Sequence, residues 1–101
     1  MKILQELDLI HQRLQQTLQK KNKDYAENLG NEFGNFESAS YISGLSVSKG
    51  ITYLASIKLS RLFNLLETES APNYESIEDS IQDAIGYLVI LSAYLKTQVR
   101  E

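Results

Sequence analysis

The 101-residue chain has no cysteine, no tryptophan, one proline and one histidine. Without cysteine it has no disulfide bond, no cysteine-ligated zinc, no iron–sulfur cluster and no thiol nucleophile. The single histidine, His11, excludes histidine-rich metal sites and argues against a Ser-His-Asp triad. Long apolar runs are missing too, and the first residues carry charge where a signal peptide needs an apolar run. We therefore expect a cytoplasmic protein with no membrane partner.

An excess of basic charge is also missing, because 10 Lys and Arg stand against 13 Asp and Glu, a net charge of −3. Proteins that bind DNA through its phosphates normally carry a basic excess on one face, so we expect no DNA partner. The length predicts a single domain over residues 1–101. A domain of this size buries only about 60 to 70% of its unfolded surface, which favours a homo-oligomer.

Apolar residues recur every three or four positions in three stretches, which predicts an all-α bundle of three main helices. The first helix is expected from Lys2 to about Leu29. The second follows a cap at Ser46 or Ser48 and ends near Glu67. The third follows a cap at Asn73 or Ser76 and runs from about Tyr74 to Gln98.

Between residues 30 and 47 the periodicity stops, and glycine, asparagine and serine predominate. This composition predicts a long loop between the first two helices. The loop contains aromatic residues, among them Phe33, Phe36 and Tyr41, which a disordered linker would not need. We expect the loop to pack on the domain and to have a function.

Two basic residues of the second helix lie on an apolar face. Lys58 and Arg61 are three residues apart and project together, on the face that also carries Val47, Ile51, Leu54 and Leu65. The helix is apolar on a second side as well, which predicts a central position or one shared between subunits. We expect the two cations to point inward or into a cleft, where a cation needs a partner.

Two acidic residues of the third helix, Asp79 and Asp83, are four residues apart. Carboxylates at this spacing can share a divalent cation or accept hydrogen bonds from Lys and Arg. Two interpretations stay open. Either these acids belong to a ligand or metal site, or they form an interior salt-bridge network with Lys58 and Arg61 in a purely structural helical module.

The end of the first helix carries further candidates. Asn22 offers an amide for reading a base, Asp24 a third metal ligand, and Tyr25 a ring for stacking. The alternative is a frayed polar helix end with Tyr25 in the core.

Four segments occur in order along the chain: Lys21–Ala26, Phe33–Glu37, Lys58–Leu66 and Glu75–Tyr87. Together they resemble a phage-associated family described as MazG-like or nucleotide-modification-associated, within the all-α nucleoside triphosphate pyrophosphohydrolase superfamily. The resemblance covers about residues 21 to 95. It implies oligomeric helical bundles in which acidic residues from two helices bind Mg²⁺, and the metal orients a nucleoside triphosphate and a water.

The second helix departs from that pattern. The hydrolases offer paired carboxylates where this chain has Lys58 and Arg61, and the closer phage family has Asp where this chain has Ile57. Glu32 replaces a proline, and Gly86 replaces an asparagine beside Tyr87. Cations with few ligand carboxylates suit binding of a phosphorylated nucleotide better than activation of water.

We therefore expect a phage-type protein that sequesters a nucleotide, or a cyclic or ADP-ribose-type immune signal, as a sponge without turnover. No cofactor is required for binding, and Mg²⁺ is compatible with it. The alternative is a Mg²⁺-dependent pyrophosphohydrolase whose metal ligands are Asp24, Asp79 and Asp83, with no assigned catalytic residue. The expected ligand-binding residues are Asn22, Tyr25, Phe33, Asn35, Phe36, Lys58, Arg61, Asp79, Asp83 and Tyr87.

Overall fold

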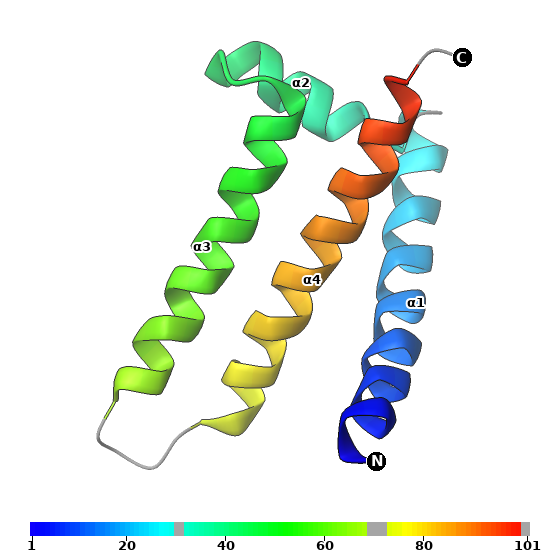
Figure 1. Cartoon of the computed structure of the whole chain (residues 1–101). Helices are drawn as coiled ribbons and strands as arrows, with labels where there is room; N and C mark the ends of the chain where they lie inside the picture. The colour runs from blue at the N-terminus through cyan, green and yellow to red at the C-terminus, as the bar shows by residue number, and fades with distance from the viewer. Residues whose placement is uncertain (30–31, 69–72, 100–101) are drawn as a thin grey trace. The chain divides into compact units, whose positions relative to one another are not determined.

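The computed structural model describes residues 1–29, 32–68 and 73–99, and for residues 22–29 it describes the backbone alone. The described part is helical, with α1 (Lys2–Leu29), α2 (Gly34–Ser43), α3 (Val47–Glu67) and α4 (Tyr74–Thr97). Figure 1 shows these four helices in chain order. The all-α prediction is confirmed, and the three predicted helices correspond to α1, α3 and α4. No helix in the described ranges is long and apolar enough to cross a bilayer.

The chain divides into two compact units, Met1–Asn35 and Phe36–Glu101. The first unit contains α1, whose predicted apolar stripe is covered unevenly. Leu14 is buried and Ile10 and Leu18 are half-buried, whereas Ile3 and Leu7 near the N-terminus are exposed.

The segment between residues 30 and 47 is the main correction to the predicted fold, because Gly34–Ser43 forms a helix instead of a loop. Gly44 adopts a positive φ of 78° directly after α2, and its N–H donates to the Ser40 carbonyl at 3.0 Å. Glycine adopts this left-handed conformation without a steric penalty, which ends the helix. Two serine hydroxyls complete the turn, with Ser40 donating to the Leu45 carbonyl and Ser43 accepting from the Leu45 N–H.

In the second unit, α3 and α4 pack against each other as an antiparallel pair (Figure 1). The two caps are among those predicted: Ser46 accepts from the Lys49 N–H at the start of α3, and Asn73 accepts from the Ser76 N–H at the start of α4. The buried residues of the pair are mostly small, namely Ile51, Ala55, Ile77, Ser80, Ala84 and Gly86. Small side chains allow two helices to approach closely.

The predicted inner face of α3 is confirmed, because Ile51 is fully buried and Val47, Leu54 and Leu65 are half-buried. The sequence predicts the core stripe of α4 as Ile77, Ile81, Ala84, Leu88, Leu91 and Leu95, and this is only partly correct. Ile77 and Ala84 are buried, but Leu88 and Leu95 are about half exposed.

Candidate functional site

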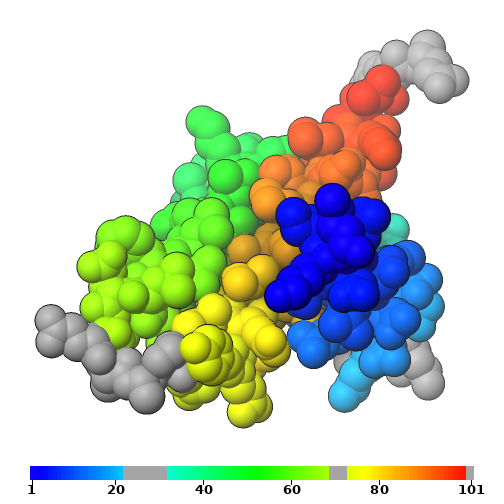
Figure 2. All heavy atoms as spheres, turned by 60° about the horizontal axis from the view of Figure 1, so that its bottom comes forward, coloured from blue at the N-terminus to red at the C-terminus, as the bar shows by residue number. Residues whose placement is uncertain are grey.

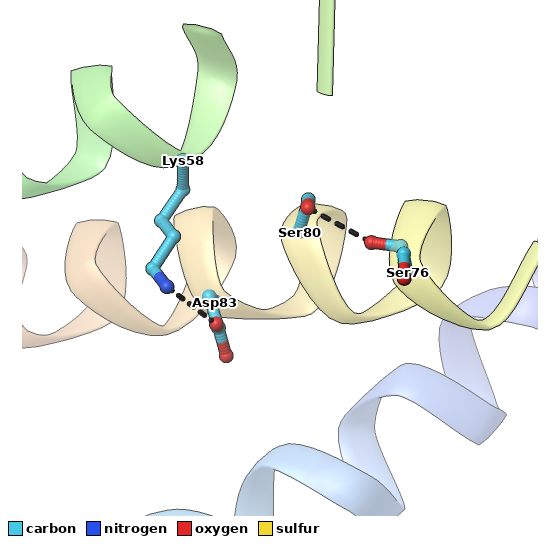
Figure 3. A network of polar contacts seen from close by, with 4 residues as sticks. All are labelled: Lys58, Ser76, Ser80 and Asp83. Carbon is cyan, nitrogen blue, oxygen red and sulfur yellow. Dashed lines mark hydrogen bonds and ion pairs between the residues drawn. The ribbon is translucent and has the colours of Figure 1, made fainter. Parts of the chain in front are cut away.

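The candidate site is the ion pair that joins the middle of α3 to the middle of α4. Lys58 Nζ lies 3.1 Å from Asp83 Oδ2, and Figure 3 shows the lysine side chain extended from α3 toward the carboxylate on α4. The side chains are 26% and 42% exposed respectively, so the pair lies at the edge of the helix contact. Water therefore reaches both charged groups, which lowers the cost of burying them and also weakens their attraction.

Arg61 was expected to point inward beside Lys58, and that expectation is wrong, since the side chain is exposed. The reason is angular. Each helical residue adds about 100°, so a residue three positions on lies about 60° around the helix from Lys58. One and two turns after Lys58, the residues of α3 that face α4 are Leu62 and Leu65, which are both half-buried.

Asp79 lies four residues before Asp83 on the facing helix, about 40° around it, and it is exposed as well. Among the described residues, neither Arg61 nor Asp79 forms an ion pair with the groups predicted for it. The proposed four-residue interior network therefore reduces to one bond, between Lys58 and Asp83.

Tyr87 lies one helical turn after Asp83 on the same face of α4 and is half-buried. Lys58, Asp83 and Tyr87 therefore occupy neighbouring positions where the two helices meet, with Arg61 exposed one turn along α3. This is the part of the predicted ligand-binding set that the structure brings together.

The other predicted residues lie elsewhere along the chain. Phe36, within α2, is half-buried, while Phe33 is half-buried and Asn35 exposed at the end of the first unit. The side chains of Asn22, Asp24 and Tyr25 lie outside the described residues. Among the residues that are described, no three His, Cys, Asp or Glu side chains are grouped so as to hold a metal ion.

Ser80 is a polar residue of this helix contact that the sequence analysis did not single out. It is almost fully buried, and its hydroxyl donates to the Ser76 carbonyl one turn earlier at 2.8 Å (Figure 3). A buried hydroxyl needs a partner, and the backbone of its own helix supplies it here. The signal in the sequence that could have identified Ser80 is its small size and its place on the same side of α4 as Asp83.

Comparison of the chain with protein-family models, with curated proteins and with solved structures gives no match.

Proposed function

We propose that the chain binds a phosphorylated nucleotide, or a nucleotide-derived signal of the cyclic or ADP-ribose type, and holds it without turnover. The observation that carries the proposal is the arrangement of cations on α3. Arg61 is exposed one turn from Lys58, and it forms no ion pair within the described part of the chain. A guanidinium offers paired donors that match two phosphate oxygens, which is the geometry of Arg–phosphate recognition.

Lys58 can contribute to the same anion because its present bond is easily exchanged. Asp83 is 42% exposed and can turn into water when a phosphate takes its place beside the ammonium group. An exposed ion pair contributes at most about 1 kcal/mol, whereas a phosphate that contacts both cations gains two charge-assisted interactions.

The neighbouring residues suit the rest of a nucleotide. The freed Asp83 carboxylate can accept hydrogen bonds from ribose hydroxyls, and the half-buried Tyr87 ring, one turn away, offers a surface for a base. Phe36 belongs to the same compact unit but lies on α2, which takes no part in the α3–α4 contact. Its role, like the roles of Asn22, Tyr25, Phe33 and Asn35, remains a prediction from the sequence.

Binding without turnover is favoured over hydrolysis by the chemistry of α3. This helix carries Lys58 and Arg61 where the resembling hydrolases carry carboxylates. A small protein that holds a nucleotide signal unchanged acts as a sponge, and in a phage it would withdraw that signal from a host defence system. The resemblance to a phage-associated family supports this setting.

A second candidate function is purely structural, and the Lys58–Asp83 bond at 3.1 Å is the observation that favours it. In that case the pair fastens α3 to α4, and no nucleotide binds there.

The deciding experiment is to denature the purified protein and identify any released nucleotide by mass spectrometry, together with a thermal-shift panel of nucleotides. A ligand at 100 times its dissociation constant stabilises the folded state by about 2.7 kcal/mol, which raises the melting temperature of a 101-residue chain by roughly 13 °C. We expect Arg61→Ala to lose most of this shift. Lys96→Ala, an exposed cation near the end of α4, should retain it.

The rival functions give different results. A nucleotide recovered unchanged after long incubation with Mg²⁺ supports the sponge, whereas released pyrophosphate, abolished in Asp83→Ala, supports the hydrolase. If no nucleotide is recovered and none raises the melting temperature, the binding proposal is wrong and the structural one is favoured.

A further inference from the structure

The side of α3 that points away from Lys58 is exposed, carries several large apolar residues and is free of charge between its two ends. We call it the outer face of α3. In Figure 2 the yellow-green end of this helix forms a surface on the side away from the yellow start of α4. Five large apolar residues on this side and its edges are 46 to 63% exposed, which is unusual for a face turned to water. Its members are Lys49, Thr52, Tyr53, Ser56, Ile57, Leu59, Ser60, Phe63, Asn64, Leu66 and Glu67.

The two charges of this face lie on one line along the helix. Lys49 and Glu67 are 18 residues apart, which is five full turns, so they point in the same direction about 27 Å apart. Both are exposed, and neither forms an ion pair among the described residues. At this distance the two charges do not interact with each other, since the Debye length is about 10 Å at 0.1 M salt.

The outer face is complementary to an inverted copy of itself. An antiparallel pairing that sets Lys49 of each copy opposite Glu67 of the other also sets Tyr53 opposite Phe63 and Ser56 opposite Ser60. A parallel pairing would instead set like charges opposite each other. A surface that matches its own inverse is what a two-fold symmetric interface requires.

The centre of the face allows a partner helix to approach closely. Ser56 and Ser60 are small, and the Ser56 hydroxyl donates to the Tyr53 carbonyl of its own helix at 2.6 Å. The Thr52 hydroxyl likewise donates to the Ser48 carbonyl at 2.8 Å. Because these donors are satisfied within α3, a partner can cover them without leaving a polar group unpaired.

We propose that the outer face of α3 is the dimer interface of this protein and that its occupant is α3 of a second copy, running antiparallel. The aromatic residues Tyr53 and Phe63 supply the apolar contact, and the Lys49–Glu67 pairs at both ends fix the direction of the partner helix. The inference does not depend on the nucleotide proposal, since none of these residues belongs to that site.

Charge reversal tests the proposal through the dimer dissociation constant, measured by analytical ultracentrifugation at low salt. Each single reversal, Lys49→Glu or Glu67→Lys, replaces two attractions by two repulsions in the dimer, and we expect it to weaken association about tenfold or more. The double variant restores opposite charges and should recover wild-type affinity. This recovery cannot arise within one chain, because the two residues are about 27 Å apart on the same helix.

A second measurement is independent of charge and uses the absence of native cysteine. A mixture of Ser56→Cys and Ser60→Cys should form a mixed disulfide on mild oxidation, because the two cysteines face each other in the proposed dimer. Each variant alone should cross-link poorly. In its dimer the two identical cysteines are offset by about 6 Å along the helix axis. The proposal is overturned if the wild type is monomeric at all concentrations tested, or if the double reversal binds no better than the singles. Equal cross-linking in all three samples would also overturn it.

Discussion

The Lys58–Asp83 bond predicts a measurable coupling energy between α3 and α4. The perturbation is a double-mutant cycle of Lys58→Met and Asp83→Asn, which remove each charge and keep most of each side chain's volume. At 3.1 Å the Coulomb energy of the pair is about 1.3 kcal/mol in a medium like water and about 5 kcal/mol at an effective dielectric constant of 20. The side chains are 26% and 42% exposed, so water screens the pair and its energy lies nearer the value of about 1.3 kcal/mol.

After the cost of desolvation and of ordering the lysine side chain, we expect a coupling of about 1 kcal/mol. Each single variant should cost no more than about 1 kcal/mol, because the remaining charged group can turn into water. For a chain of this length the coupling corresponds to about 5 °C in melting temperature. Salt at about 1 M, where the Debye length is about 3 Å, should reduce it.

The assay is urea unfolding followed by circular dichroism, with free energies compared across the four proteins of the cycle. The matched control is the same cycle with Asp79→Asn in place of Asp83→Asn. Asp79 is exposed and not bonded to Lys58, so the two changes should be additive. The reasoning is refuted if both cycles give the same coupling, or if the Lys58–Asp83 coupling is zero at low salt.

Two further predictions concern packing and backbone. Ile51→Ala should destabilise the protein by about 2 to 5 kcal/mol because Ile51 is fully buried, while Ile42→Ala, at a position on α2 that is 83% exposed, should cost much less. Equal losses of unfolding free energy in the two variants would contradict this reading of the core. Gly44→Ala should cost about 1 to 2 kcal/mol, since alanine is strained at a φ of 78°. Gly50→Ala should instead stabilise by up to about 1 kcal/mol, because Gly50 lies within α3 and an added Cβ meets nothing within 4 Å. Thermal melts of both glycine variants check the opposite signs.

The three long helices could be predicted because each carries a strong local signal. Apolar spacing marked the inner face of α3, and the side chains of Ser46 and Asn73 bond the backbone N–H groups that begin α3 and α4. Such caps act within one turn, so a sequence reveals them without knowledge of the fold.

The helix α2 escaped prediction because it has no comparable apolar stripe and no buried residue. Its serines and glycines indicate a loop by composition. In the structure Ser40, Ser43 and Gly44 form the hydrogen-bonded end of the helix. Composition alone does not distinguish a loop from the end of a helix, because serine and glycine occur in both.

The candidate site was predicted in part. The cross-helix bond between Lys58 and Asp83 was one of the expected pairings, but Arg61 and Asp79 were expected to join it and are exposed. Spacing of three or four residues places side chains near one another on a helix, yet it does not say which of them faces the neighbouring helix. That depends on an angular difference of about 40 to 60°, which tertiary packing decides.

The position of Asp79, one turn before Asp83, has a consequence for the register of the α3–α4 pair. Sliding one helix by a turn, about 5.4 Å, in one direction would leave Lys58 opposite the uncharged Tyr87. Sliding it the other way would offer Lys58 the carboxylate of Asp79 in place of Asp83. The ion pair therefore disfavours only the slip that places Lys58 opposite Tyr87. Against the other slip, the pair depends on the fit of its buried residues, above all Ile51 and Ala55.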